Sequence, residues 1–354
     1  MFYNFYKNKK VLITGHTGFK GTWLTLWLFI LGAKITGISN SFYTKPSHFK
    51  LLKLHRKINH LSLDISKMEL LNSVIKKSKP DIIFHLAGQS MVKKSFLNPL
   101  ETWKTNSLGT INILECLRKY NKKCSLIIIT SDKSYKNLEI KRGYKETDLI
   151  GGEDPYSASK SSAELAIQSY FKSFLNKDKK IKLVVARAGN VIGGGDWTAD
   201  RLMPDAVKSW IVNKSLTVRN PISTRPWQHV LDVLYGYLIL GYLLSKNKKL
   251  NGEVFNFGPN YKKNYKVIEV LKIVKKIWPG VKWRIVKNSS FYESKLLKLN
   301  SSKAFKKLRW KTSLNLDLTL KFTIDWYIKF YKNPKKVFKI SSDSIKNYIK
   351  ELKY

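Results

Sequence analysis

The sequence predicts an α/β protein in which a doubly wound parallel sheet precedes a smaller C-terminal α/β domain. Over the first half of the 354 residues, short β-branched runs alternate with longer segments of helical spacing, a pattern typical of strand–helix–strand units. These runs are apolar on both faces, as expected for strands that helices cover on either side. After Arg187 the rhythm changes to a stretch rich in glycine, aspartate, arginine and tryptophan, which indicates the second domain.

The elements of this fold can be placed along the chain from the periodicity of apolar residues. Strands are expected at Lys10–Thr14, Lys34–Ile38, His60–Asp64, Asp81–Ala87, Ser125–Ser131 and Lys182–Arg187. Helices are expected between them at Trp23–Leu31, Met68–Lys76, Ile111–Arg118 and Ser159–Phe174, and later at Val230–Lys246, Lys266–Ile277 and Leu316–Phe330. The later segments should cover the carboxyl ends of the strands, the edge at which open α/β sheets bind ligands.

The composition excludes several classes of protein. Hydrophobic residues make up 43% of the chain and aromatic residues 13%, enough for a sizeable core. Cys116 and Cys124 are too isolated for a disulfide framework or a structural zinc site, and no metal site is expected. The N-terminus has no apolar signal core, and the longest apolar stretch, Val230–Leu244, is shorter than a membrane span and contains Asp232. A soluble, cytoplasmic protein without membrane insertion is expected.

The formal net charge of +42 has two interpretations. A basic surface can bind nucleic acid or anionic membranes by neutralising phosphates. Alternatively, the charge reflects a lysine-rich compositional background, since lysine greatly outnumbers arginine and is spread along the whole chain. We favour the second interpretation and expect no specific nucleic-acid partner.

The segment Val11–Gly21 reads VLITGHTGFKG and places Gly15, Gly18 and Gly21 between an expected strand and an expected helix. Glycines at this spacing let the backbone approach a pyrophosphate at the helix N-terminus, so the segment predicts a Rossmann-type dinucleotide site. An acidic residue after the second strand would bind the ribose of NAD, but Ser39 and Asn40 stand there. NAD is therefore favoured over NADP only weakly.

Two further segments indicate chemistry at the same edge. Tyr156 and Lys160 are four residues apart on an expected helix, so the ammonium should lower the pKa of the phenol and let it accept a proton from a substrate hydroxyl. Ser131, Asp132 and Lys133 follow the fifth expected strand and combine a hydroxyl, an acid and a base. This combination suits chemistry beyond simple oxidation.

From Lys10 to about Tyr331 the chain resembles the extended short-chain dehydrogenase/reductase superfamily, and more narrowly the CDP-glucose 4,6-dehydratases. The resemblance rests on GHTGFKGTWL, FHLAGQ, NPLETWKTNSLGT, ITSDKSY, GGEDPYSASK, RAGNVIGGGDWTADRLMPD and NPISTRPWQHVLD. Lys133 matches this branch, because related dehydratases have glutamate there. Two residues depart from the pattern: Gly88 stands where alanine is usual, and Lys93 where arginine is more frequent.

The resemblance implies NAD-dependent dehydration of CDP-glucose to a 4-keto-6-deoxy sugar, in deoxysugar biosynthesis for surface polysaccharide, by a homodimer. Tyr156 would take the C4 hydroxyl proton, helped by Ser131 and Lys160, while Lys133 would act as base at C5 and Asp132 as acid at C6. Cofactor contacts are expected from Gly15, Thr17, Gly18, Phe19, Gly21, Asp64, Ile65, Leu86, Ala87, Gln89, Thr105, Thr130, Tyr156 and Lys160. Substrate contacts are expected from Asn190, Arg201, Arg219, Arg225 and His229.

The expected domains follow from these assignments. Residues 1–188 should form the dinucleotide-binding domain, with some later segments returning to it, residues 189–332 mainly the nucleotide-sugar domain, and residues 333–354 a basic extension. Trp197 and Trp227 suit either apolar walls or base stacking, and His229 suits either substrate contact or core packing.

Alternative functions remain open at this point. Another nucleotide-sugar 4,6-dehydratase would share all these motifs, whereas a 4-epimerase needs only the serine, tyrosine and lysine, so the Asp132–Lys133 pair argues against it. A catalytically inactive basic Rossmann protein that binds RNA would not need to retain Tyr156, Lys160 or Asp132, yet all three are present.

Overall fold

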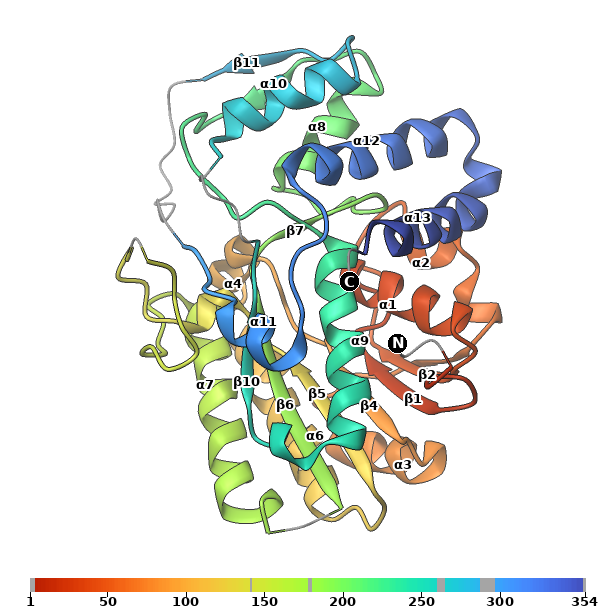
Figure 1. Ribbon diagram of the computed structural model, residues 1–354, viewed down its shortest axis with the longest axis vertical. Helices are drawn as coiled ribbons and strands as arrows, with labels where there is room; N and C mark the ends of the chain where they lie inside the picture. The colour runs from red at the N-terminus through yellow and green to blue at the C-terminus, as the bar shows by residue number, and fades with distance from the viewer. Residues whose placement is uncertain (1–3, 141, 178–179, 260–264, 287–296, 353–354) are drawn as a thin grey trace.

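The computed structural model describes residues 4–140, 142–177, 180–259, 265–286 and 297–352. In this part of the chain seven parallel strands form one sheet in the order β10-β6-β5-β4-β1-β2-β3 (Figure 1). The strands are β1 Lys10–Thr14, β2 Lys34–Ser39, β3 Asn59–Ser62, β4 Ile82–His85, β5 Cys124–Ile129, β6 Ile181–Ala188 and β10 Val254–Phe257. The order reverses between β1 and β4, which places the ligand crevice at their carboxyl ends. The predicted doubly wound sheet is confirmed.

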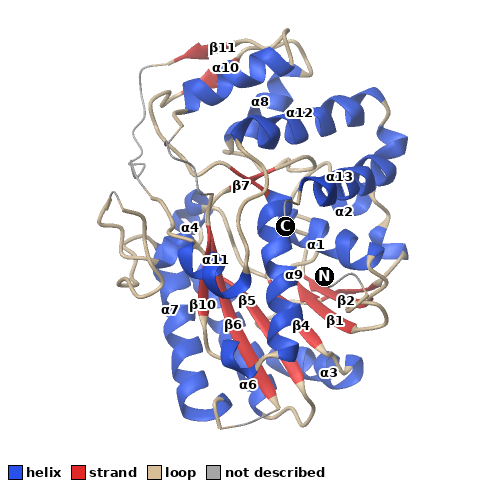
Figure 2. Ribbon diagram, viewed as in Figure 1, coloured by secondary structure: helices blue, strands red, loops and turns tan. Residues whose placement is uncertain are grey.

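Helices cover both faces of this sheet (Figure 2). Strand residues of one parity, such as Leu126 and Ile128, pack with α3 (Met68–Ser78), α6 (Gly109–Arg118) and α7 (Pro155–Tyr170). Residues of the other parity, such as Ile127, pack with α1 (Phe19–Ile30) and α9 (Val230–Lys246). Because the central strands β4 and β5 are buried on both faces, their sequences are apolar runs, whereas the edge strand β3 is partly exposed and more polar.

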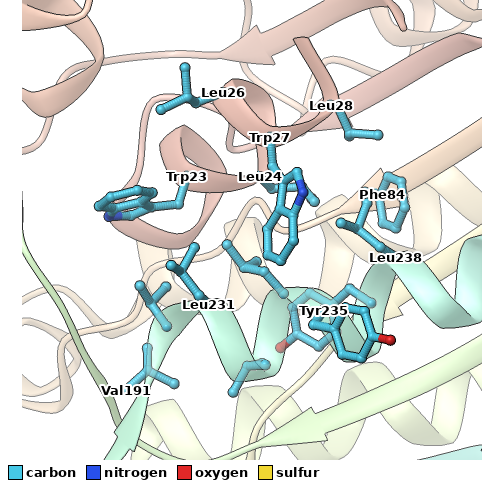
Figure 3. Close-up of a cluster of buried hydrophobic side chains, with 14 of the residues drawn as sticks. Trp23, Leu24, Leu26, Trp27, Leu28, Phe84, Val191, Leu231, Tyr235 and Leu238 are labelled. Atoms are coloured by element: carbon cyan, nitrogen blue, oxygen red, sulfur yellow. The ribbon is translucent and has the colours of Figure 1, made fainter. Parts of the chain in front are cut away.

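The core on the α1 side is rich in aromatic side chains (Figure 3). Trp23 and Trp27 of α1 project toward α9, where Leu231, Tyr235 and Leu238 meet them. The Trp23 indole donates to the carbonyl oxygen of Gly194 at 2.9 Å. This contact fixes the glycine-rich segment after β6 to the first helix.

The remaining elements gather mainly over the carboxyl edge of the sheet (Figure 1). Two short parallel pairs form there: β7 (Val191–Ile192) with β9 (Gln228–His229), and β8 (Leu216–Val218) with β11 (Trp283–Ile285). The helices are α2 His48–Leu51, α4 Val92–Leu97, α5 Pro99–Trp103, α8 Leu202–Trp210, α10 Val267–Ile277, α11 Ser302–Leu308, α12 Leu316–Lys332 and α13 Val337–Glu351, with π-helical turns at Lys104–Leu108 and Phe171–Leu175. Short 3-10 turns are Leu54–Arg56, Asp132–Ser134, Lys248–Leu250 and Pro334–Lys336. Side chains of α8, α10, α12 and β8 share a separate apolar core.

The short strands β7, β8, β9 and β11 and the helices α2, α4, α5, α8 and α11 were not predicted from the sequence. Two further elements, which belong to the main core, also differ from the expectation. Strand β10 was not predicted, and it adds a seventh strand at the edge beside β6. The segment expected as a basic extension forms α13, whose Val337, Ile345 and Tyr348 are buried in the core on the α1 side. Within the described residues, no helix combines the length and the apolarity that a membrane crossing requires.

A buried carboxyl group joins α9 to α13. Asp232 Oδ1 accepts hydrogen bonds from the Tyr348 hydroxyl at 2.8 Å and from the Ser313 amide at 2.8 Å. Burial raises the pKa of Asp232 to about 7, and these hydrogen bonds only partly oppose the shift. The unfolded carboxyl titrates near its ordinary value of about 4.

The free energy of unfolding should therefore depend on pH through Asp232. Between about pH 4 and pH 7 the folded chain binds one proton more than the unfolded chain, so this contribution to stability falls as pH rises, by on the order of 4 kcal/mol at most. Asp232→Asn keeps an acceptor oxygen and removes the titration. Urea unfolding at pH 5 and pH 8 should show wild type losing more stability than the variant; equal losses would contradict the expectation.

Candidate active site

The carboxyl end of β5 carries the turn that the sequence predicted to be catalytic, residues 131–134, called the catalytic turn below. Ser131 caps a 3-10 turn over Asp132–Ser134, because its Oγ accepts the Lys133 amide at 3.2 Å. The Ser131 hydroxyl donates to Asp132 Oδ1 at 3.0 Å. Ser131 and Asp132 are buried and Lys133 is half-buried. Burial raises the pKa of Asp132, although Lys133, Ser131 and Lys20 oppose the shift.

Helix α7 brings Tyr156 to this turn. The helix begins at Pro155 because Asp154 caps it, accepting the amides of Tyr156 and Ser157 at 3.0 Å each. Tyr156 is buried and hydrogen-bonded to Ser131. Burial raises the pKa of Tyr156 to about 12, while the Ser131 hydrogen bond lowers it. The expected net lowering is therefore wrong for the free chain, since desolvation of the phenolate outweighs the charges around it.

Lys160 lies one turn further along α7 and is also buried. Burial lowers the pKa of Lys160 to about 8, and the carboxylate of Glu164 opposes the shift. A Cβ added at Gly88 would lie 2.9 Å from the Lys160 Nζ. The departure from alanine at position 88 therefore gives the ammonium more room at the end of β4.

The turn between β1 and α1 is suited to a dinucleotide. Gly15 has a φ of +74°, and a Cβ there would lie 2.7 Å from the Ala87 amide, so only glycine fits. Gly18 is the N-cap of α1 and supplies no side-chain cap, and the first turn has no acidic residue. The free amides and positive end of the dipole can thus receive a pyrophosphate. The residues present fit the expected cofactor.

The other expected cofactor residues surround this turn. Thr17 fastens it to β2 through its hydroxyl, which lies 2.6 Å from Ser39 Oγ. Asp64 follows β3, is half-buried, and accepts the Ser66 amide at 2.8 Å. The remaining positions lie at or near the carboxyl edge of the sheet and along the π-helical turn: half-buried Phe19, Leu86, Ala87 and Thr105, and buried Gly21, Ile65, Gln89 and Thr130. Their contacts with a cofactor remain predictions.

Of the expected substrate residues, Arg201 is the one whose charge acts on Tyr156. Its guanidinium pairs with Asp196 at 3.1 Å and contacts Ser90 Oγ at 3.4 Å. Asn190 is exposed just beyond β6. Arg225 is half-buried and donates to the Thr224 carbonyl at 2.9 Å. Lys93, the second departure, forms an exposed ion pair with Asp200 at 3.7 Å.

Two expected substrate residues have other surroundings. Arg219 is exposed after β8, where its charge acts on Asp205 of α8. His229 is 2% exposed and caps α9, its Nδ1 accepting the Leu231 amide at 3.3 Å. Packing therefore accounts for His229 better than contact with a substrate.

Trp197 and Trp227, which could have served as apolar walls or as base-stacking surfaces, are both buried. The Trp197 indole donates to the Tyr331 hydroxyl at 3.2 Å, and the Trp227 indole donates to the Tyr265 carbonyl at 3.2 Å. This favours apolar walls over base-stacking surfaces.

Comparison with known proteins gives the family of this chain. Residues 12–323 match the model of the GDP-mannose 4,6-dehydratase family. The chain belongs to this family. It is 39% identical over 330 residues to CDP-glucose 4,6-dehydratase of Salmonella typhimurium, covering 92% of each protein. The expected relationship to the CDP-glucose 4,6-dehydratases is confirmed.

Solved structures that are similar to this chain confirm its fold. UDP-glucose 4-epimerase of Thermotoga maritima superposes with a TM-score of 0.77 at 22% identity, covering 91% of this chain and 99% of the epimerase. dTDP-glucose 4,6-dehydratase of Bacillus anthracis, solved with NAD, gives 0.74 at 23% identity, covering 92% and 99%.

Three residues of this family member contribute to the site without having been predicted. Lys20, in the first turn of α1, is half-buried; burial lowers its pKa to about 8, and the charges of Asp132, Arg201 and Lys160 act on it. Asn106 ties the loop after β4 to α7, accepting the Gln89 amide at 2.8 Å and donating to Ser159 Oγ at 2.9 Å. Glu164 holds the residue before Ser131, with 2.7 Å between its Oε1 and the Thr130 hydroxyl. Lys20 and Asn106 stood in segments that supported the resemblance, but no spacing rule singled them out.

Proposed function

We propose that this chain is a CDP-glucose 4,6-dehydratase, a lyase that converts CDP-glucose to CDP-4-keto-6-deoxyglucose and water. The observation that carries the proposal is the buried Ser131–Asp132 pair, followed by Lys133 and placed beside Tyr156. An oxidation alone needs no acid and base next to the serine, whereas elimination of water from C5 and C6 needs both. The 39% identity with the Salmonella enzyme supports CDP-glucose as the substrate.

The cofactor of the proposal is NAD, held by the turn after β1, by the residues expected around it and by Lys160. Bound NAD would supply a hydride acceptor at C4 and return the hydride at C6, so the reaction is redox neutral. The NAD complex of the Bacillus anthracis dehydratase supports this choice. Asn40 and Asp64, whose side chains are 3.5 Å apart, are the proposed polar groups on the adenosine side.

The chain's own residues would move the protons. A bound NAD would add a positive charge that favours the phenolate of Tyr156 over the neutral phenol of the free chain. This phenolate accepts the proton of the C4 hydroxyl, and Ser131 hydrogen-bonds the same oxygen. The resulting ketone acidifies the C5 proton, which Lys133 takes, while Asp132 protonates the departing 6-hydroxyl. The raised pKa of Asp132 suits this role, because an acid must hold its proton until the leaving group departs. The C5 proton returns from Lys133, and the proton that Tyr156 took restores Asp132.

The proposal also assigns the nucleotide end of the substrate. Asn190 and Arg225 are proposed to contact the diphosphate, and Arg201 the region between the diphosphate and Tyr156. Arginine binds phosphate oxygens in bidentate fashion, which suits this assignment. A cytoplasmic location and a role in deoxysugar biosynthesis for surface polysaccharide are parts of the proposal that depend on the substrate.

The experiment that tests the function compares CDP-, dTDP-, GDP- and UDP-glucose with the purified chain and NAD. CDP-glucose should give the largest alkali-induced absorbance of a 4-keto-6-deoxy sugar. If a nucleotide sugar with another base reacts fastest, the proposed substrate would change, but the proposed dehydration would stand. Formation of the 4-epimer without any ketosugar would contradict the dehydratase proposal.

We further propose that the chain is a homodimer formed through α4, α5 and α7. Helices α4 and α5 pack against α7. On and next to these helices lie exposed apolar side chains, Phe96, Leu97, Leu100, Trp103, Leu108 and Leu165, which are between 38% and 72% exposed. An apolar surface of this kind indicates a protein partner, and a second copy buries it by two-fold symmetry.

The double variant Leu97→Asp/Leu100→Asp should therefore be a folded monomer, since four carboxylates would meet at the interface. Sedimentation velocity should show half the mass of wild type. Ile222→Asp is the control, because Ile222 is 69% exposed and lies outside these helices. A dimeric double variant, or a monomeric wild type, would contradict this interface.

For the net charge we propose no nucleic-acid role. Affinity for duplex DNA or RNA should be weak and should fall steeply between low and physiological salt, because it would come only from phosphate neutralisation. Filter binding at both salt concentrations measures this. Tight, sequence-selective binding at physiological salt would show that the charge has a function.

A further inference from the structure

Glu164 is a buried carboxylate that the proposed reaction does not use. It lies on α7 one turn after Lys160, and its side chain is 1% exposed. It forms an ion pair with Arg187 of β6, which is also 1% exposed, and the Arg187 Nε donates to both carboxylate oxygens at 2.8 and 3.0 Å. Burying two charges is costly, so such a pair is weak evidence for stability alone. Its position among the catalytic elements suggests another use.

The first observation is that Glu164 holds the strand that carries the catalytic turn. Its Oε1 lies 2.7 Å from the Thr130 hydroxyl, and Thr130 directly precedes Ser131. The Arg187 guanidinium lies over the Tyr135 ring at 4.5 Å. The pair therefore contacts the chain on both sides of the turn formed by residues 131–134.

The second observation is that the Glu164 charge faces Lys160. Lys20 on α1 and His85 on β4 also face this ammonium, and Tyr156 lies one turn before it on α7. Burial disfavours the Lys160 ammonium, whereas the charge of Glu164 favours it. The charge of Lys160 in turn lowers the pKa of Lys20. His85 is buried and burial lowers its pKa to about 3, so it brings no positive charge at neutral pH.

We propose that Glu164 is a positioning residue: held by Arg187, it sets the end of β5 against α7, so that Ser131 meets Tyr156, and it keeps a negative charge facing Lys160. This inference rests on the proposed function for its effect on turnover. Its effect on Lys160 is a property of the chain without substrate.

The test uses variants that separate the two parts. Glu164→Gln keeps acceptor and shape but removes the charge, so Lys160 should lose its proton about one pH unit lower than in wild type. Reductive methylation of Lys160 by labelled formaldehyde, followed by peptide mass spectrometry across a pH series, measures this without substrate. The pH at which kcat falls on the alkaline side should be lower by the same amount.

Thr130→Val keeps the Glu164 charge and removes the hydrogen bond to it. It should lower kcat by roughly tenfold without changing the pH at which kcat falls, since a misplaced Ser131 slows the reaction.

Glu115→Gln is the matched control, because Glu115 on α6 also binds an arginine, Arg118, at 2.7 and 2.8 Å, away from the catalytic turn. It should leave both measurements unchanged. If Glu164→Gln alone does not fold, Glu164→Gln/Arg187→Met removes both charges and should shift the Lys160 titration in the same direction by a smaller amount, because no unpaired arginine charge is left behind. A folded charge-removed variant with the wild-type labelling profile and the wild-type fall of kcat on the alkaline side would overturn the proposal. If wild type turns over no nucleotide sugar, the proposed function fails, and the labelling profile decides the Lys160 part alone.

Discussion

Tyr156→Phe should reduce turnover of CDP-glucose by at least about a thousandfold while leaving the fold and NAD binding intact. General acid–base catalysis by one side chain contributes about 10²–10⁴ in rate, and we propose Tyr156 as the group that takes the C4 proton. Removing its hydroxyl also leaves Ser131 without this partner, although the serine keeps its bond to Asp132 at 3.0 Å. The backbone of α7 should not change, because Asp154 caps it through main-chain amides.

The measurement is steady-state turnover of CDP-glucose, with circular dichroism and NAD titration on the same samples. Tyr170→Phe on the same helix is the control, since its hydroxyl contacts Glu115 at 3.4 Å, away from the catalytic turn, and its loss should leave turnover unchanged. Activity of Tyr156→Phe within about threefold of wild type, a difference under 1 kcal/mol in activation free energy, would remove the tyrosine from the reaction.

Most of the sheet could be predicted because each buried strand is a continuous apolar run between turns. Strand β10 could not, because Asn256 interrupts its short run. The structure shows why this polar residue is tolerated: its amide accepts the Tyr135 hydroxyl at 2.8 Å and donates to the Tyr144 carbonyl at 2.8 Å. Tertiary partners thus overrode the composition of the strand.

Helix α13 was hidden by its lysines. Val337, Ser341, Ile345 and Tyr348 are spaced by four, four and three residues and lie buried, which is a helical pattern. The basic residues between them made the segment resemble a solvated extension. Periodicity was a better guide here than mean composition.

The proximity of the proposed catalytic residues was predictable because it follows from their spacing, whereas their electrostatics do not. Residues four apart on a helix share a face, and this placed Tyr156 near Lys160. The direction of the Tyr156 pKa shift depends on burial by elements far away in sequence, and no local pattern reports it. Glu164 was missed for a related reason, since its partners are Arg187 of β6 and Thr130, the residue after β5, and both are distant in sequence.

The roles of Asp132 and Lys133 give the sharpest test of dehydration against simple oxidation. Ser131, Tyr156 and Lys160 suffice for oxidation at C4, so variants at 132 and 133 should still perform it. Asp132→Asn keeps the shape and removes the transferable proton, and Lys133→Met keeps the stem and removes the amine. In a single turnover with CDP-glucose, both variants should show the absorbance of reduced nicotinamide. Formation of the 4-keto-6-deoxy product should fall by roughly a hundredfold or more, because elimination of water stalls.

Exchange of the C5 hydrogen with deuterated solvent then separates the acid from the base. Lys133→Met should lose the exchange, since no amine removes the C5 proton, whereas Asp132→Asn should retain it, because the proton is removed and returned while the 6-hydroxyl stays. If both variants form product at the wild-type rate, Asp132 and Lys133 have no role in elimination, and the turn after β5 is only a polar loop. The dehydratase proposal would then lose the observation that carries it. If neither variant oxidises C4, Asp132 and Lys133 would instead act before oxidation, by positioning the sugar against Tyr156. The buried Ser131–Asp132 hydrogen bond would then serve this positioning.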